Sequence, residues 1–316
     1  SGLNTAYDFT TPVTTVTVVY AKWTENKPEV VGYKLMLTGD IGVEIYLLIP
    51  DSILETEGAK VLVSCAIPGK TDVEKEYLVK DLTDNKCTIN VPAAAMTCPI
   101  TVKVVYGETV EELDNFTVKD YADYILNHQD EADYAKAAPL VEAMLNYGAY
   151  SQKYFGINTD KLANAGITDN VPSANPGKYD GIPSNMVPDD APITYYGSSL
   201  SLESKVSATI YFNKKNGDYY NNLQFQVNGK EPLTIVENAT PGYISININD
   251  INPADLITHK YVIRISKIGG SVDYNYSYSP LYFMQAACAS ESVGDDMKNL
   301  AKALYLYGEA AKNYVG

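Results

Sequence analysis

A helix-like phrase occurs twice in this chain, once near the middle and once at the end. The first copy is AKAAPLVEAMLNYGAYSQKYFG at residues 135–156, and the second is DDMKNLAKALYLYGEAAKNYVG at residues 295–316. An alignment without gaps matches Leu140, Ala143, Tyr147, Gly148, Tyr154 and Gly156 with Leu300, Ala303, Tyr307, Gly308, Tyr314 and Gly316. A match of this kind predicts that two parts of the chain share one structural plan.

A strand-like phrase is also duplicated, upstream of each helix phrase. Residues 35–47 (LMLTGDIGVEIYL) match residues 200–212 (LSLESKVSATIYF). The identical pairs are Leu35/Leu200, Leu37/Leu202, Ile45/Ile210 and Tyr46/Tyr211. Strand and helix recur in the same order and over far more residues than a solenoid period, which favours two lobes. The matched residues are apolar or aromatic, so the duplication indicates a shared core rather than a shared active site.

Short strands dominate each lobe before the helices begin. In the first lobe we expect strands at residues 13–23, 33–37, 43–49, 60–67, 74–79, 87–91, 100–106 and 115–119, and helices at 121–126 and 135–155. In the second we expect strands at residues 199–202, 206–212, 223–227, 233–236, 243–247, 261–268 and 273–279, and helices at 281–289 and 295–314. The spacing predicts a mixed β and α fold with two tandem repeats, each an antiparallel β-sandwich followed by an α-helical hairpin.

The boundaries follow from a segment without apolar periodicity. Residues 169–191 (DNVPSANPGKYDGIPSNMVPDDA) are rich in proline and glycine, which is typical of a linker that forms no element of its own. The predicted domains are therefore a first lobe at 1–168, the linker at 169–191 and a second lobe at 192–316.

Composition excludes several classes of partner. The formal net charge is -15, and a chain this acidic repels nucleic acids and anionic membranes. No run of 18 apolar residues is present, so we expect no membrane insertion. Among the four cysteines, Cys288 is expected to be a buried free thiol. Cys65 and Cys87 lie in strand-like segments, and the sequence leaves a disulfide between them possible.

The sequence carries no catalytic motif. His128 lies in a polar stretch and His259 precedes a strand, and neither is near a serine or cysteine motif. No GxSxG, P-loop, GxGxxG or Cys/His zinc pattern occurs. We therefore expect no enzyme, no metal and no cofactor, although a glycoside hydrolase needs only two carboxylates, which spacing cannot reveal.

Aromatic residues in loops give the remaining signal, in a chain with 27 Tyr, 6 Phe and 1 Trp. Aromatic rings cover the C–H faces of neutral sugars, while amide and carboxyl groups bind the hydroxyls. The turn at residues 216–222 combines both kinds of group. The candidate glycan-binding residues are Trp23, Tyr179, Tyr195, Tyr196, Tyr219, Tyr220, Asn221 and Asn222. The alternative for the turn is a hairpin loop whose side chains bind no ligand. The alternative for Trp23 is a residue that packs in the core.

Other tyrosines have the spacing of core residues. Tyr147, Tyr154, Tyr307 and Tyr314 recur on the helical stripe, and Tyr274, Tyr276 and Tyr278 alternate along one strand. We expect both sets to be buried.

The duplicated phrases carry a resemblance. GYKLMLTGDIGVEIYLLIPDSI, the YADYIL helix, LVEAMLNYGAYSQKYFG and NLAKALYLYGEAAKNYV resemble a module of extracellular multidomain proteins of gut Firmicutes. In overall plan the chain is similar to the starch-adherence modules of amylosome proteins. That resemblance implies a secreted or cell-surface location, α-1,4-glucan binding without cleavage, and other modules of a larger surface protein as neighbours.

These observations predict a noncatalytic carbohydrate-binding module of a secreted or cell-surface bacterial protein. We expect starch or maltooligosaccharides as the ligand, held in a groove between the two lobes. The alternative is a structural or protein-interaction module of a surface protein without glycan binding.

Overall fold

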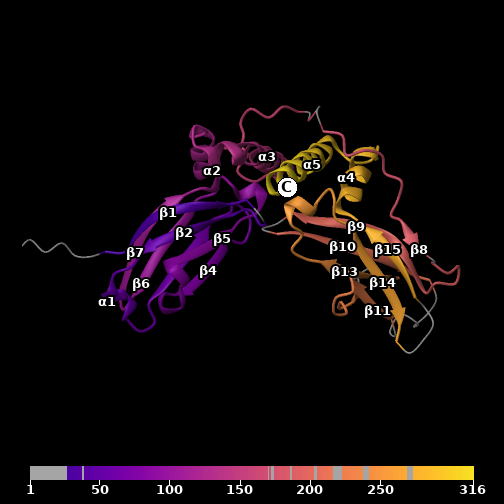
Figure 1. The fold of residues 1–316 in the computed structure, drawn as a ribbon, viewed down its shortest axis with the longest axis horizontal. Helices are drawn as coiled ribbons and strands as arrows, with labels where there is room; N and C mark the ends of the chain where they lie inside the picture. Colours follow the sequence, from indigo (N-terminus) through magenta and orange to yellow (C-terminus); the bar gives the residue numbers. More distant parts are fainter. Residues whose placement is uncertain are drawn as a thin grey trace, which may run out of the picture.

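The structure is a computed structural model that describes residues 27–316 except 38, 170, 172–173, 186, 203–204, 216–222, 238–241 and 269–272. β-Sheets lie on both sides of a central group of helices, one set from each half of the chain (Figure 1). The strand pairs of the described residues are antiparallel. The expected class of antiparallel β-structure combined with helices is therefore confirmed.

The first half forms two sheets and a helical hairpin. Its strands are β1 (Glu29–Met36), β2 (Gly42–Leu48), β3 (Lys60–Cys65), β4 (Val73–Leu78), β5 (Lys86–Asn90), β6 (Ile100–Tyr106) and β7 (Thr109–Phe116). Its helical segments are α1 (Asp51–Leu54), η1 (Val79–Asp81), η2 (Thr83–Asn85), η3 (Ala93–Ala95), α2 (Val118–Asn127) and α3 (Ala132–Phe155). The sheet orders are β1-β2-β5 and β4-β3-β6-β7.

The second half also contains two sheets followed by a pair of helices. Its strands are β8 (Ser184–Asn185), β9 (Ile193–Leu202), β10 (Val206–Lys214), β11 (Leu223–Val227), β12 (Val236–Glu237), β13 (Tyr243–Ile248), β14 (Tyr261–Lys267) and β15 (Asp273–Tyr278). Its helical segments are η5 (Pro253–Asp255), α4 (Pro280–Ala289) and α5 (Asp295–Val315). The sheet orders are β12-β13-β10-β9 and β11-β14-β15-β8.

Within each half, the two sheets pack against each other through alternating apolar side chains. In the first half, Tyr33 of β1 contacts Phe116 of β7, with 4.1 Å between ring centroids. In the second half, Phe212 of β10 lies 5.4 Å from Phe225 of β11 and 5.9 Å from Tyr276 of β15. Strands with one buried face and one outer face follow from this period-two pattern.

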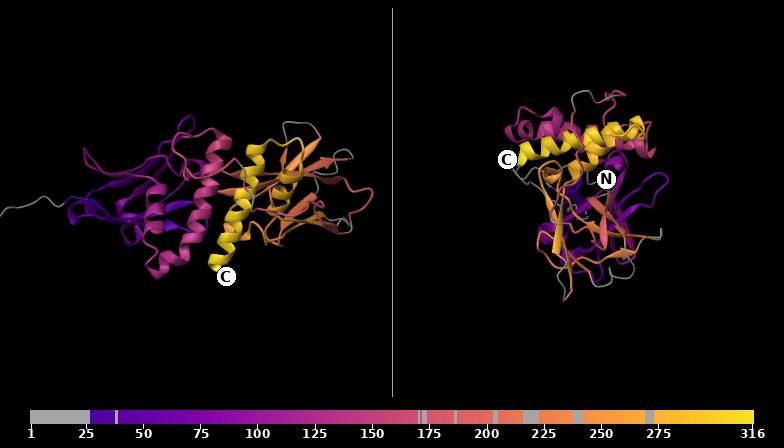
Figure 2. Two further views of the ribbon diagram at one scale, coloured as in Figure 1. Left: turned by 90° about the horizontal axis from the view of Figure 1, so that it is seen from above. Right: turned by 90° about the vertical axis from the view of Figure 1, so that its right-hand side faces the viewer.

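Helices α3 and α5 join the halves and lie side by side (Figure 2). The rings of Tyr147 and Tyr307 stack at 5.5 Å between centroids and 9° between planes, and both residues are almost fully buried. Lys136 near the start of α3 lies over the ring of Tyr314 near the end of α5, so the two helices are antiparallel. The duplicated tyrosines thus pack on one another at the centre of the molecule.

The duplicated glycines permit close approach of each helix to a neighbouring 3₁₀ turn. A Cβ on Gly148 would lie 2.7 Å from Sδ of Met96 and 3.1 Å from the carbonyl oxygen of Ala93. A Cβ on Gly308 would lie 3.1 Å from atoms of Leu256 and Ile257 and 3.5 Å from the carbonyl oxygen of Pro253. Only glycine fits both contacts without displacing a neighbour.

Several expectations about the core and the boundaries change. Tyr274, Tyr276 and Tyr278 are buried, as predicted, but Tyr154 is 40% exposed. Tyr314 is half-buried at a surface groove rather than deep in the core. Tyr154 and Tyr314 each lie on the last turn of their helix, beyond the buried part of the stripe.

Other local predictions were wrong because side-chain and backbone pairing overrode the pattern. The strand expected at residues 115–119 ends at Phe116 as part of β7, and Thr117 caps α2 through a reciprocal capping box with Asp120. Part of the expected linker forms a strand, since β8 pairs with β15 at Asn275 and Tyr276. Cys65 and Cys87 are free and buried, and Cys288 is free and half-buried.

Candidate functional site

The outer face of the sheet formed by β9, β10 and β13 gathers aromatic and hydroxyl side chains. The register places Tyr211 of β10 opposite Ser245 and Gly197, and Asn213 opposite Tyr243 and Thr194. The intervening residues of β10, including Ile210 and Phe212, are buried on the other face. Alternation along these strands therefore presents Tyr211 and Tyr243 outward, at one side of the second half.

A β-bulge brings a third tyrosine to this face. The register of β9 and β10 shifts between the pairs Tyr211/Gly197 and Phe212/Tyr195, so Tyr196 is the extra residue. Its side chain is 60% exposed, and its ring centroid lies 4.7 Å from that of Tyr243 with 60° between planes. A hydrogen bond with the Tyr196 hydroxyl raises the pKa of Tyr243. The bulge thus produces a pair of exposed rings that meet at an angle.

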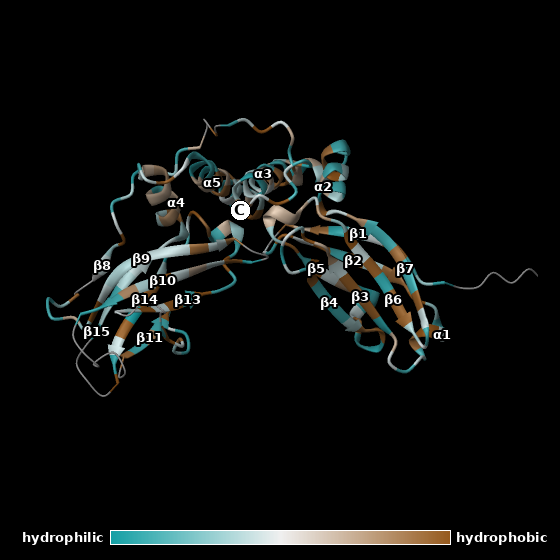
Figure 3. Ribbon diagram, turned by 180° about the vertical axis from the view of Figure 1, so that it is seen from behind, coloured by the Kyte–Doolittle hydropathy of each residue, from teal (hydrophilic) through white to brown (hydrophobic). Residues whose placement is uncertain are grey.

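Neutral polar groups surround these rings. Ser199 Oγ lies 3.2 Å from the Tyr211 hydroxyl, and Thr209 Oγ1 donates to Asn247 Oδ1 at 2.9 Å. The exposed and half-buried outward positions of β9, β10 and β13 in the described chain carry no charged side chain: Thr194, Tyr196, Gly197, Ser199, Ser201, Ser207, Thr209, Tyr211, Asn213, Tyr243 and Asn247. We call this set the tyrosine face. In Figure 3 the ribbon of β9 is largely pale, because Thr, Tyr, Gly and Ser have intermediate hydropathy.

The one lysine of these strands belongs to the other side. Lys214 lies opposite Ile193, which is buried, and its ammonium group contacts Glu237 Oε2 at 2.7 Å. The tyrosine face therefore offers aromatic rings, hydroxyls and amides, and no fixed charge of its own.

The predicted site residues are divided by this arrangement. Tyr196 is on the tyrosine face, but Tyr195 pairs with Phe212 and packs against the core side. Its backbone N–H donates to the Tyr276 hydroxyl at 3.2 Å, and burial raises the pKa of Tyr195 to about 12. Tyr179, which is half-buried, interacts with the Tyr195 hydroxyl. The structure thus brings Tyr179 and Tyr195 together and turns Tyr196 away from both.

The remaining predicted residues, Trp23, Tyr219, Tyr220, Asn221 and Asn222, lie outside the described residues. The last described residue before the turn at 216–222 is Lys215, whose N–H donates to the carbonyl oxygen of Pro192 at 2.8 Å. The neighbouring Lys214 N–H donates to Gly242 O at 2.8 Å. Strand β10 therefore ends at the end of the sheet where Tyr196 and Tyr243 lie.

Sequence reasoning missed Tyr211 and Tyr243. Tyr211 was assigned to the shared core because Tyr46 occupies the equivalent position, but both side chains are half-buried and point outward. The signal was present in the alternation, because Tyr211 follows Ile210 and precedes Phe212, which are both buried.

The described residues contain no cluster of metal-binding side chains, and both of their histidines lie against a polar neighbour. No group of three or more His, Cys, Asp or Glu among them is placed to hold a metal ion. His128 Nδ1 lies 2.8 Å from the carbonyl oxygen of Tyr124, and His259 Nε2 lies 3.2 Å from Asn228 Nδ2. Among the described helices, none has both the length and the apolar character that a membrane span needs.

No protein-family model matches the chain, and a search of the curated proteins finds no match.

Proposed function

We propose that this chain is a noncatalytic carbohydrate-binding module of a secreted or cell-surface bacterial protein, and that its ligand is an α-1,4-glucan such as starch. The observation that carries the proposal is the tyrosine face, where Tyr196, Tyr211 and Tyr243 stand among neutral hydroxyl and amide groups. The resemblance to starch-adherence modules supports the choice of ligand.

The chemistry of the face suits an uncharged sugar chain. Tyrosine rings supply apolar surface for the C–H faces of the sugar, and their hydroxyls remain available for hydrogen bonds. The Ser, Thr and Asn side chains of the same strands add donors and acceptors for sugar hydroxyls. A charged ligand would find no partner on these strands, because the tyrosine face carries no charged group.

We also propose that the two halves are tandem repeats, with a first lobe at 1–168, a linker at 169–191 and a second lobe at 192–316. The strand orders β1-β2-β5 and β9-β10-β13 support this division, as do the stacked Tyr147 and Tyr307. Superposition of the two lobes in an experimental structure tests it. Equivalent residues such as Tyr147 and Tyr307 should then fall on one another.

Calorimetric titration with maltoheptaose tests the glycan proposal. Tyr196→Ala and Tyr243→Ala should each weaken binding about fivefold, because stacking on an exposed ring contributes on the order of 1 kcal/mol. Thermal unfolding should hardly change, since Tyr196 is 60% exposed. Tyr154→Ala, at another exposed tyrosine, is the matched control and should leave binding unchanged.

The same samples separate the alternatives. Affinity electrophoresis against amylopectin, xylan and mucin reports which glycan is bound. Failure of the unmutated protein to bind any of them would favour the structural or protein-interaction module. Release of reducing sugar would instead indicate a glycoside hydrolase.

A further inference from the structure

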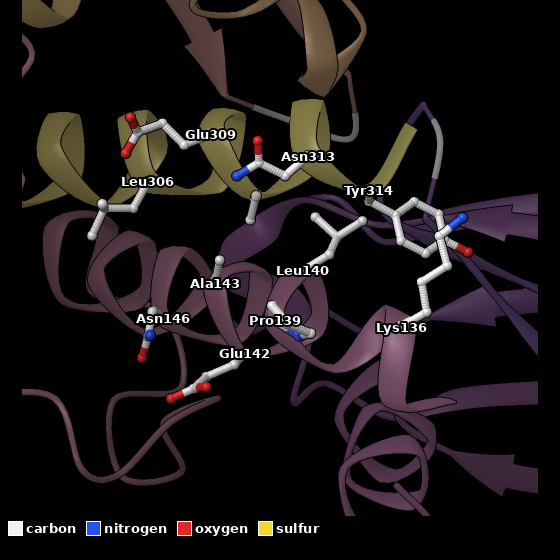
Figure 4. A pocket seen from close by; sticks show the side chains of 11 residues that line it. Lys136, Pro139, Leu140, Glu142, Ala143, Asn146, Leu306, Glu309, Asn313 and Tyr314 are labelled. Atoms are coloured by element: carbon white, nitrogen blue, oxygen red, sulfur yellow. The ribbon is translucent and has the colours of Figure 1, made fainter. Parts of the chain in front are cut away.

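Helices α3 and α5 line a surface hollow of about 450 Å³ between them. Its floor is apolar and contains Leu140, Ala143, Leu306 and Ala310. The small side chains of Ala143 and Ala310 leave space between the two helices. Figure 4 shows Glu142 and Asn146 on α3, and Glu309 and Asn313 on α5, along the two edges of this hollow.

A second hollow of about 550 Å³ adjoins the first. It lies between β1 and β2, helix α2 and the start of α3, and Tyr121 and Tyr134 line it together with Lys34, Glu44 and Asp133. Both volumes fall within the range of about 300–1,000 Å³ that is typical of small-molecule sites.

The two hollows meet at Lys136 and Tyr314, which line both of them. The Lys136 ammonium lies 5.1 Å from the centroid of the Tyr314 ring (Figure 4). We call the two hollows, joined at this pair, the helix groove. A ligand that extends from one hollow to the other has to pass the Tyr314 ring.

The charges that line the helix groove exclude an anionic ligand. Two lysines, Lys34 and Lys136, face four carboxylates: Glu44, Asp133, Glu142 and Glu309. Lys34 is also partly neutralised, because its Nζ lies 3.9 Å from Glu44 Oε2. An apolar floor with tyrosines and with amides at its edges matches the C–H faces and hydroxyl rim of a neutral sugar.

We infer that the helix groove is a second glucan-binding site, separate from the tyrosine face, and that Tyr314 is its central platform. The inference rests on the proposed function, because it takes the same ligand class. The sugar ring would stack on Tyr314 where Lys136 now lies, and Asn313 would bind its hydroxyls. Asn146, which lies roughly 15 Å further along α3 than Lys136, would bind the hydroxyls of another sugar of the same chain. One chain would then hold two glucan segments at once, which raises its apparent affinity for branched or granular starch.

The duplication supplies a matched control. Tyr154 aligns with Tyr314, is also on the last turn of its helix, and packs edge-on against Phe155 at 4.9 Å. Tyr154 lines neither hollow of the helix groove. The two tyrosines therefore differ in whether they face a cavity, and not in residue type or helical position.

The test is titration of maltoheptaose into the full chain in which Tyr196→Ala, Tyr211→Ala and Tyr243→Ala have removed the three rings of the tyrosine face. In that background we expect binding to persist, Tyr314→Ala to weaken it about fivefold, and Tyr154→Ala to leave it unchanged. Asn313→Trp is a second variant, at an exposed position, that should block the groove by filling it. Thermal unfolding of each variant checks that it is folded.

The outcomes separate the two proposals. Unchanged binding in both Tyr314→Ala and Asn313→Trp would overturn the helix groove. Complete loss of binding in the background variant would also overturn it, while leaving the proposed function in place. No binding by the unmutated chain to maltoheptaose or amylopectin would overturn both. A loss in Tyr314→Ala that is matched by Tyr154→Ala would show a general effect of the helix ends and would overturn the site.

Discussion

The two sheets that match in strand order have different outer faces. On β1, β2 and β5 the outward positions include Lys34, Glu44 and Lys86, with Tyr46 as the only ring. On β9, β10 and β13 the outward positions carry three tyrosines and no charge. The inner faces of both sheets are apolar. The comparison teaches that two sheets with the same strand order and apolar inner faces have outer faces of different chemistry, one charged and one with tyrosines and hydroxyls.

The shared tyrosines of the helices show the opposite behaviour. Tyr147 and Tyr307 pack against each other at the centre of the molecule. Burial raises the pKa of both phenols. A change in either residue would leave the other without its stacking partner, so we expect substitutions here to be more destabilising than substitutions on the outer faces.

The largest expected effect is the loss of stability when a tyrosine of the core is removed. Tyr147→Ala and Tyr307→Ala should each destabilise the protein by about 3–5 kcal/mol, as other large-to-small core changes do. Tyr154→Ala should cost less than about 1 kcal/mol, since the side chain is 40% exposed. Urea unfolding measures all three. A cost below about 1 kcal/mol at Tyr307 would show that the ring is not a core element.

Raising the pH should destabilise the protein first through its buried thiols and then through its buried tyrosines. Burial raises the pKa of Cys65 and of Cys87, in the first half, to about 12. The thiols of the unfolded chain ionise at about pH 8.5. Above that pH the free energy of unfolding falls by about 1.4 kcal/mol per thiol for each pH unit. The stability that these two thiols contribute is therefore fully present below about pH 8.5 and is lost progressively as the pH rises toward 12.

The buried tyrosines of the second half should respond at higher pH than the thiols. Burial raises the pKa of Tyr274 and Tyr278, and unfolded tyrosine ionises near about pH 10. Urea unfolding at pH 7, 9 and 10 should show a loss of stability at pH 9 and 10 that the variant Cys65→Ala/Cys87→Ala reduces. An equal slope in the variant and the parent chain would refute the assignment to the thiols.

A smaller effect compares the two outer faces directly. Tyr211→Ala should weaken maltoheptaose binding about fivefold, whereas Tyr46→Ala, at the matching position of the charged face, should leave it unchanged. Binding should also be the same at low and high salt, because neither the ligand nor the tyrosine face carries charge. Equal losses in the two variants would mean that the faces are not functionally different.

The smallest effect concerns the contact between the halves. Lys205 and Asp40 occupy matching positions of the duplicated phrase, and their Nζ and Oδ2 atoms lie 3.6 Å apart. Lys205 also contacts Asp250 at 2.5 Å. Lys205→Ala should change the unfolding temperature only slightly at low salt and not at high salt, since Lys205 is exposed. A large loss would show that this pair fixes the arrangement of the halves.

The sequence by itself determined the class of fold and most of the core. Period-two patterns located strands such as β10 and β15, and period 3.6 located α3 and α5, because each pattern reports which side chains share a buried face. The start of α2 was missed because it depends on the hydrogen bonds of Thr117 and Asp120, which no periodicity records.

Only the tertiary structure decided which aromatic residues are exposed together. Tyr196 and Tyr243 are far apart in sequence and meet because a bulge in β9 turns one ring onto the outer face of β10 and β13. Tyr314 and Lys136 meet because α3 and α5 run antiparallel. Residue type predicts what a tyrosine is able to bind, but exposure and neighbours depend on register and helix packing, which are set by contacts between distant parts of the chain.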